Sequence, residues 1–365
     1  MNLHDLFAIP LHRTPDKIAI HLLDAKPTPT ALTYADLYAA VDRLAAGLQQ
    51  WGLHKGDRVA FYLGSRAELI IAYLAVIRLG AVVVPINLRY RRLEIGHILA
   101  DCTPRLLVTE NSQLPFLAEV GAEKNCLEAQ LLAEEFDTWL GDAAQVQRPL
   151  VQSEDLALII YTSGTTGRSK GAMITHNNVI ATVTGLLAAW AWTPQDKLLL
   201  CLPLFHTHGL IVGLHCALAA GATVLLRAQF EAQTIISDLL SGEPTLFFAV
   251  PTIYVRLVEE LKQRPQPDLH HMRLFCSGSA PLAAETFVSF QELTGHTILE
   301  RYGMTETGMN LSNPYSGDRV PGSVGTPLPG VAMRIVDRKG QDLNAGEEGE
   351  LLVRGSNVFS AYWNA

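Results

Sequence analysis

Residues 161–171 read YTSGTTGRSKG, and this stretch decides how the rest of the chain is interpreted. It holds three glycines, five Ser and Thr hydroxyls and two cations within eleven residues. Glycine lets backbone N–H groups turn toward a ligand, hydroxyls donate hydrogen bonds to oxyanions, and Lys170 adds a positive charge. The stretch therefore predicts a loop that binds a polyphosphate, because a flexible surface turn would not require this mixture. The predicted contacts are Thr162, Ser163, Gly164, Thr165, Thr166, Gly167 and Lys170.

The segments on either side of this phosphate loop predict a β-hairpin. Leu156–Tyr161 and Ala172–Ile174 are apolar runs of strand type. Thr175 or Asn177 is suited to cap a following helix. A Walker A loop instead opens directly into a helix, and its G-x-x-x-x-G-K-[ST] spacing does not fit this stretch. A P-loop NTPase is therefore disfavoured.

Alternating helix and strand patterns predict an α/β fold. Glu68–Leu79 has a helical pattern that Gly80 ends, and Ala81–Ile86 follows as a short apolar strand. Gly209–Leu226 is apolar enough to suggest a membrane helix, but Gly221 divides it into a helix-sized and a strand-sized piece. Such alternation favours largely parallel sheets covered on both faces, and we expect two sheets. After about residue 313, Gly/Pro turns and short alternating strands predict a small antiparallel unit.

The composition describes a mildly acidic, folded chain. Its 365 residues carry 28 Lys plus Arg against 36 Asp plus Glu, a formal net charge of −8. The one dense basic run, Arg89–Arg92, is too short for a nucleic-acid footprint, so no nucleic-acid partner is expected. The five cysteines are widely spaced without a C-x-x-C motif, and residues 1–17 have no signal or transit pattern. We therefore expect a cytoplasmic protein without a membrane span, and no pattern indicates an oligomeric state.

Several motifs together resemble the adenylate-forming superfamily, which includes acyl-CoA synthetases, luciferases and peptide-synthetase adenylation domains. The phosphate loop is one of them. The others follow the order of that family: Leu32-Thr33-Tyr34, Leu79-Gly80-Ala81, Val84-Pro85-Ile86-Asn87, Leu204-Phe205-His206, His208-Gly209, Ser277-Gly278-Ser279-Ala280-Pro281, Tyr302-Gly303-Met304-Thr305-Glu306-Thr307 and Gly349-Glu350-Leu351. The resemblance spans essentially all 365 residues. It implies an N-terminal domain with two α/β sheet subdomains, approximately residues 1–185 and 186–312, and a small β-barrel part at 313–365.

The resemblance also implies a reaction. In this family a carboxylate attacks the α-phosphate of ATP with Mg²⁺ present, and the thiol of coenzyme A then opens the acyl-adenylate. Attack of one anion on another requires charge neutralisation and alignment. By resemblance, Glu306 would hold Mg²⁺, Thr305 would hydrogen-bond the α-phosphate, and His206 would gate the passage between the acyl pocket and the coenzyme A tunnel. A metal site at His206 and His208 would lack a third ligand nearby. The nucleotide would contact Gly278, Ser279, Ala280, Glu300, Tyr302 and Gly303.

Within this superfamily, the segments around two arginines are similar to those of malonyl-CoA synthetases. Arg301 precedes Tyr302 at a position facing the acyl pocket, where many relatives carry a small uncharged residue. Arg256 is predicted on a helix, where pairing with Glu260 at i+4 is the alternative to an inward direction. By resemblance, Arg256, Ser277 and Arg301 would grip the distal carboxylate of malonate or methylmalonate. A buried, unpaired arginine would be a poor host for a fatty tail.

The family pattern includes parts that this sequence is expected to lack. Full-length members have a further strand motif with an aspartate for the ribose, then a hinge, then a small C-terminal lid domain with a lysine that assists adenylation. The expectation is therefore the large domain of a malonyl-CoA synthetase, which binds ATP or an acyl-adenylate but is inactive or weakly active alone. The alternatives are a CoA ligase for another short-chain or aryl acid, and a nucleotide-binding module without turnover.

Overall fold

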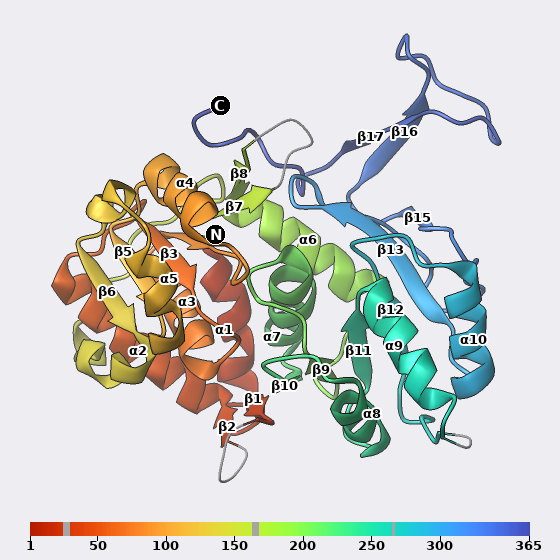
Figure 1. Cartoon of the computed structure of the whole chain (residues 1–365), viewed down its shortest axis with the longest axis horizontal. Coiled ribbons are helices and arrows are strands. Elements are labelled where there is room, and N and C mark those ends of the chain that lie inside the picture. Colours follow the sequence, from red (N-terminus) through yellow and green to blue (C-terminus); the bar gives the residue numbers. More distant parts are fainter. Residues whose placement is uncertain (25–29, 163–167, 265–266) are drawn as a thin grey trace.

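Two β-sheets with helices around and between them form the fold (Figure 1). The computed structural model describes residues 1–24, 30–162, 168–264 and 267–365. Five of the predicted phosphate contacts, Ser163, Gly164, Thr165, Thr166 and Gly167, lie outside the described residues.

The first sheet has six strands in the order β6-β5-β3-β4-β7-β8. Neighbouring strands are parallel except β7 and β8, which form the predicted hairpin around the phosphate loop. Strands inside a parallel sheet are covered on both faces, and all four residues of the Val-Val-Val-Pro strand β4 are buried. The strands are β3 (Arg58–Tyr62), β4 (Val82–Pro85), β5 (Leu106–Thr109), β6 (Ala129–Leu132), β7 (Leu156–Thr162) and β8 (Lys170–Thr175).

The second sheet has nine strands in the order β15-β14-β13-β12-β11-β9-β10-β1-β2. The six strands from β13 to β1 in this order pair in parallel, and the outer pairs are antiparallel. β1 and β2 belong to this sheet, although residues 1–185 were expected in the first one; Ile20 of β1 lies opposite Val224 of β10. The strands are β1 (Ile18–Leu22), β2 (Thr30–Thr33), β9 (Lys197–Leu200), β10 (Thr223–Leu226), β11 (Leu246–Ala249), β12 (Leu274–Ser277), β13 (Ile298–Met304), β14 (Gly308–Ser312) and β15 (Thr326–Pro327).

The helices cover the sheets and separate them (Figure 1). The α-helices are α1 (Leu3–Arg13), α2 (Tyr34–Trp51), α3 (Ala67–Arg78), α4 (Arg92–Cys102), α5 (Leu114–Ala118), α6 (His176–Ala189), α7 (Cys216–Ala220), α8 (Ala232–Leu240), α9 (Pro251–Leu261) and α10 (Ala284–Thr294). Thr175 caps α6: its hydroxyl accepts the N–H of Asn178 over 3.1 Å, and the Asn178 side chain accepts the N–H of Thr175 over 2.9 Å.

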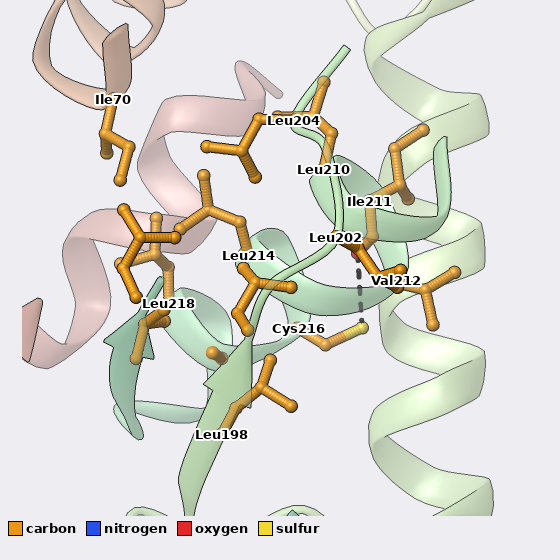
Figure 2. Close-up of a cluster of buried hydrophobic side chains, with 14 of the residues drawn as sticks. Ile70, Leu198, Leu202, Leu204, Leu210, Ile211, Val212, Leu214, Cys216 and Leu218 are labelled. Carbon is orange, nitrogen blue, oxygen red and sulfur yellow. Dashed lines mark hydrogen bonds between the residues drawn. The ribbon is translucent and has the colours of Figure 1, made fainter. Parts of the chain in front are cut away.

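A continuous apolar core joins the two sheets through these helices. Figure 2 shows part of it, where the π-helix His208–His215 and α7 pack beside β9. The Sγ of Cys216 contacts the backbone carbonyl of Ile211 within this cluster over 3.5 Å. Leu198 and Leu214 are fully buried in it. These buried side chains thus tie the second sheet to the helices that lie between the two sheets.

The apolar stretch Gly209–Leu226 divides at Gly221, as predicted. The π-helix and α7 end there, Gly221 adopts φ of +72°, and β10 follows. A side chain is strained at such a φ, which explains the glycine. No helix within the described ranges is both long and apolar enough to cross a bilayer.

The segment from residue 313 onward contains the predicted short strands. β16 (Ala332–Val336) and β17 (Glu350–Arg354) pair in an antiparallel two-stranded ribbon that projects from the body (Figure 1). β15 instead extends the second sheet. The described part of this segment therefore forms an open ribbon and not a closed barrel, since barrel closure needs more strands than two.

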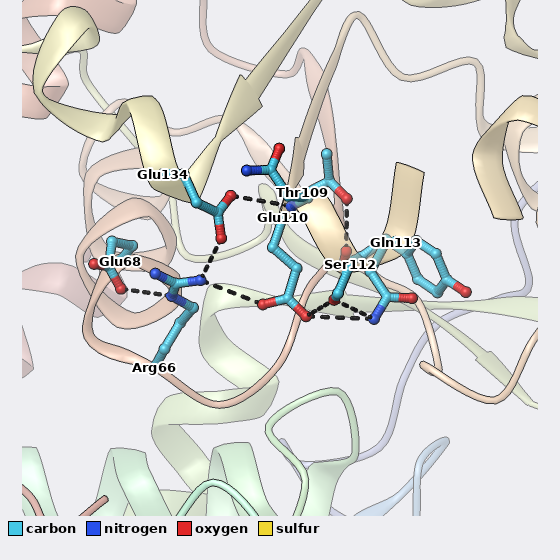
Figure 3. A network of polar contacts seen from close by, with 9 residues as sticks. Arg66, Glu68, Thr109, Glu110, Ser112, Gln113 and Glu134 are labelled. Atoms are coloured by element: carbon cyan, nitrogen blue, oxygen red, sulfur yellow. Dashed lines mark hydrogen bonds and ion pairs between the residues drawn. The ribbon is translucent and has the colours of Figure 1, made fainter. Parts of the chain in front are cut away.

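A network of polar side chains fixes the edge of the first sheet beyond β3 and β5 (Figure 3). Arg66 bonds three carboxylates, those of Glu68 over 2.8 Å, Glu134 over 2.9 Å and Glu110 over 3.4 Å. Glu134 also accepts the backbone N–H of Asn111 over 3.0 Å. Because all three acids share Arg66, this group holds loops together and is not a free acidic site.

Candidate functional site

A cavity opens at the carboxyl ends of the parallel strands in the second sheet, where ligand sites of such sheets usually lie. Its volume is about 400 Å³, and segments that follow β9, β11 and β12 line it together with β13. Five predicted site residues line this cavity: His206, Ser279, Arg301, Gly303 and Thr305. The fold therefore brings together residues that are up to 99 positions apart in the sequence.

The phosphate loop and the turn between β13 and β14 are in direct contact. Thr162, the first residue of the loop, donates a hydrogen bond from Oγ1 to Oε1 of Glu306 over 3.0 Å. The hydroxyl of Tyr362 donates to the same oxygen over 3.1 Å. Glu306 is buried, with 9% of its surface exposed. The two segments that the sequence predicts around a nucleotide's phosphates thus face each other.

Arg301 occupies the buried side of the cavity. Only 4% of its surface is exposed, and its Nε and Nη2 have no hydrogen-bond partner in the described part of the chain. Gly278 makes room for it, because a Cβ at that position would lie 2.4 Å from the Arg301 Cζ. Burial lowers the pKa of the guanidinium from its ordinary value, although arginine keeps its proton in proteins. The site therefore contains a desolvated positive charge with two donors available.

His208 lies near this charge, but Ser277 does not line the cavity, because it pairs with Glu300 and its side chain therefore lies on the other face of the sheet from Arg301. The Ser277 hydroxyl and the Nε2 of His208 have no partner among the described residues. The Nδ1 of His208 lies 3.3 Å from Oγ of Ser279, which itself adopts φ of +72°. Burial holds the pKa of His208 well below its ordinary value, and Arg301 lowers it further. The imidazole of His208, the hydroxyl of Ser279 and the guanidinium of Arg301 all line the cavity and together would suit a ligand with several acceptor oxygens.

Other predicted nucleotide contacts take different positions. Tyr302 lies in β13 beside Gly303 and is half-buried, while Ala280 and Lys170 are exposed. Glu300 faces away from the cavity, because its carboxylate accepts the backbone N–H of Gly322 over 2.8 Å. Desolvation raises the pKa of Glu300. Its carboxylate therefore holds a loop in this structure and does not line the cavity.

The structure does not bring Arg256 to the other predicted carboxylate ligands. Arg256 is exposed on α9, and its Cζ lies 4.8 Å from the ring centroid of Phe230. No ion pair of the described residues joins it to Glu260 either. Stacking on an aromatic ring gives the guanidinium a favourable place outside the cavity.

Two residues of the site were not predicted from the sequence. His208 was considered only as a metal ligand, although its motif already placed it near His206. Tyr362 lies 56 positions after Glu306, so no local pattern connects the two residues. The contact of Thr305 with a phosphate and the gating role of His206 stay predictions.

Comparison with known proteins places this site in a family. Residues 7–363 match the family model of AMP-binding enzymes. The human malonate–CoA ligase ACSF3, named as mitochondrial, is 37% identical over an alignment that covers 91% of this chain and 65% of that protein. An oxalate–CoA ligase from Arabidopsis thaliana is 35% identical over 91% of this chain and 67% of its own length. The chain thus spans less than two thirds of the length of the human relative.

Solved structures agree in fold. The apo structure of MatB from Rhodopseudomonas palustris is 39% identical with a TM-score of 0.90, and the match covers 100% of this chain and 72% of that chain. A malonyl-CoA ligase ternary product complex with methylmalonyl-CoA and AMP is 34% identical with a TM-score of 0.82, over 98% of this chain and 71% of that chain. Because the family model matches residues 7–363, the chain belongs to the AMP-binding enzyme family.

Proposed function

We propose that this protein performs the chemistry of a malonyl-CoA synthetase: malonate, ATP and coenzyme A give malonyl-CoA, AMP and diphosphate. The observation that carries the proposal is the buried guanidinium of Arg301, whose Nε and Nη2 have no hydrogen-bond partner among the described residues, in a cavity that Thr305 also lines. Relatives named for malonate, and a related structure that holds methylmalonyl-CoA and AMP, support this choice of acid.

The nucleotide would bind between the phosphate loop and the turn at Thr305 and Glu306. Mg²⁺ usually binds proteins through one or two carboxylates together with substrate phosphates. Among the described residues no three His, Cys, Asp or Glu side chains are grouped to hold a metal by themselves, whereas Glu306 fits as the single carboxylate. When bound, Mg²⁺ would neutralise charge on the phosphates. Thr305 would donate its hydroxyl to the α-phosphate.

The acid would bind with its reacting carboxylate toward Thr305 and its distal carboxylate toward Arg301. Neutral His208, which lines the same cavity as Arg301, can donate a hydrogen bond to the distal carboxylate beside the guanidinium. An anion in this place restores the partners that Arg301 and His208 lack among the described residues. A hydrocarbon tail would leave those groups unpaired, at a cost of about 1–3 kcal/mol for each. The cavity therefore favours a short diacid over a fatty acid.

The residues would act mainly by alignment and charge. Arg301 and His208 would fix one end of the acid, so that the other carboxylate stays in line with the α-phosphorus. Holding two reactants in line removes much of the entropic cost of a bimolecular step. His206 lies exposed at the mouth of the cavity, where it would gate entry of the coenzyme A thiol.

Calorimetric titration of the chain tests the proposal. MgATP should bind, and malonate should bind in the presence of a non-hydrolysable ATP analogue at least tenfold more tightly than propionate, since propionate lacks the second carboxylate. Oxalate serves as the shorter diacid. Equal affinity for malonate and propionate would remove the specificity claim, and absence of MgATP binding would remove the nucleotide site.

Turnover is measured on the same protein as thioester formed from malonate, ATP and coenzyme A. Malonyl-CoA, AMP and diphosphate in equal amounts would support the full reaction. Because the large domain alone is expected to be inactive or weakly active, binding of both ligands without thioester would leave the choice of acid to the malonate and propionate titrations.

A further inference from the structure

Residues 359–364 form a strap that joins the two halves of the candidate site. At one end, the N–H of Phe359 donates to the backbone carbonyl of Glu306 over 2.8 Å. At the other end, the N–H of Trp363 donates to the carbonyl of Gly171 over 2.7 Å. Between these, the N–H of Met173 donates to the carbonyl of Ala361 over 3.1 Å. The strap therefore connects the β13–β14 turn to the hairpin that carries the phosphate loop.

Side chains anchor the strap beyond the site as well. The indole Nε1 of Trp363 donates to the backbone carbonyl of Asp101 over 3.1 Å, and the Asn364 amide donates to the same carbonyl over 2.9 Å. The Nζ of Lys170 lies 5.4 Å from the ring centroid of Tyr362. Backbone hydrogen bonds of Ala361 and Trp363 thus flank Tyr362 on both sides and fix the direction in which its side chain points.

The hydroxyls of Tyr362 and Thr162 both donate a hydrogen bond to the same oxygen of Glu306. Both hydrogen bonds are made to Oε1, over 3.1 Å and 3.0 Å. Oε2 of Glu306 accepts no hydrogen bond from any described residue. Two donors on one oxygen fix the rotation of the carboxylate and leave the lone pairs of the other oxygen for a ligand.

We propose that Tyr362 is a positioning residue for the metal site: its hydroxyl fixes the Glu306 carboxylate so that Oε2 is directed to the Mg²⁺ of bound MgATP. This inference rests on the proposed function, which assigns Mg²⁺ to Glu306. It adds a residue outside every motif that the sequence indicated. It also gives the strap a role, because the strap decides where that hydroxyl lies.

The same hydrogen bond could instead act as a mask: Tyr362 would then block the Glu306 carboxylate and compete with the metal for it. The two roles predict opposite signs. Loss of a positioning hydroxyl weakens metal-dependent binding, whereas loss of a mask strengthens it. Positioning is favoured by the shared Oε1, because a mask would need to occupy the oxygen that faces the ligand.

Tyr362→Phe tests the proposal, since it removes the hydroxyl and keeps the ring beside Lys170. Calorimetry gives the Kd of ATP in excess Mg²⁺ and in EDTA, and the ratio of the two is the metal-dependent gain. Removal of a residue that orients a metal ligand typically lowers metal affinity 10–100-fold. We therefore expect the gain to fall about tenfold in Tyr362→Phe, with the Kd in EDTA unchanged.

Two further variants separate this role from a structural one. Glu306→Gln should remove the gain, and adding Tyr362→Phe to Glu306→Gln should then change nothing more, because the hydroxyl acts through the carboxylate. Tyr62→Phe is the matched control, since it deletes a hydroxyl that donates to the Tyr90 carbonyl over 3.0 Å, away from Glu306. Its gain should equal that of the wild type.

The outcomes distinguish the two levels of the proposal. If Mg²⁺ strengthens ATP binding to the wild type, and Tyr362→Phe shows the same or a larger metal-dependent gain, the positioning role is overturned and the metal assignment of Glu306 stands. A wild type that binds ATP equally with Mg²⁺ and with EDTA overturns the metal assignment of Glu306 and the positioning role together. Additive effects of Tyr362→Phe and Glu306→Gln also overturn the positioning role.

Discussion

Replacing Arg301 with methionine should separate ligand recognition from stability. Arg301 is 4% exposed, and its Nε and Nη2 lack partners within the described ranges. A hydrogen bond to a charged group contributes about 1.5–3 kcal/mol, so two such bonds to a distal carboxylate amount to about 3–6 kcal/mol. At about 1.4 kcal/mol per factor of ten, Arg301→Met should weaken malonate binding by roughly 100-fold to 10,000-fold. Propionate binding should change little.

The same substitution should not destabilise the ligand-free protein. An unsatisfied buried donor costs about 1–3 kcal/mol, more for a charged group, and replacing buried charges with apolar side chains of similar size is often neutral or stabilising. We expect the free energy of unfolding of Arg301→Met to equal that of the wild type or to exceed it by up to about 3 kcal/mol. Urea titration without ligand measures this quantity.

Calorimetry with malonate and propionate in the presence of an ATP analogue provides the binding data. Arg354→Met is the matched control, because Arg354 is an exposed arginine on β17. An Arg301→Met protein that still prefers malonate by the wild-type factor would refute the role of Arg301. A clear loss of stability in the ligand-free protein would show that Arg301 has partners that the reasoning omits.

Three further predictions concern the interior. Asp196→Ala should lower the free energy of unfolding by about 3–5 kcal/mol in urea titration, because Asp196 is buried and accepts two bonds from the half-buried Arg273, at 2.5 and 2.6 Å; a loss below 1 kcal/mol would contradict this. Burial lowers the pKa of His215 to about 3, so between pH 6.5 and 3 the unfolded chain binds a proton that the folded chain does not, and stability falls as the pH falls through this range. In urea titrations from pH 6.5 to 4, His215→Gln should reduce the change in the free energy of unfolding with pH by about 1.4 kcal/mol per pH unit. An unchanged pH dependence of that free energy would refute this. Gly278→Ala should weaken malonate binding at least tenfold by calorimetry, because its Cβ would lie 2.4 Å from Cζ of Arg301, and wild-type affinity would show that Arg301 can move at no cost.

Local patterns predicted several elements correctly. Gly80 and Gly221 mark the ends of helices, and both have a positive φ in the structure. The hairpin of β7 and β8 and the cap at Thr175 were predicted because turn and capping chemistry acts over a few residues. These are features that a short window of sequence contains.

Features that depend on distant partners could not be predicted in this way. The direction of Arg256 depends on Phe230, which lies on another segment, and helical periodicity does not contain that contact. The bond between Glu300 and Gly322 is of the same kind. The approximate subdomain boundaries and a cytoplasmic location stay predictions, and the human relative is named as mitochondrial.

The pairing of β1 with β10 makes the second sheet depend on the beginning of the chain. Ile20 lies opposite Val224, so roughly two hundred residues must emerge from the ribosome before β1 has its neighbour. Closing a loop of that length carries an entropic cost that only late contacts repay, which makes such pairing slow. Until then β1 exposes an unpaired edge on which another chain could add a strand. A gene divided between the two sheets would therefore not encode two independently folding halves, because the second half would lack the strands that complete its edge.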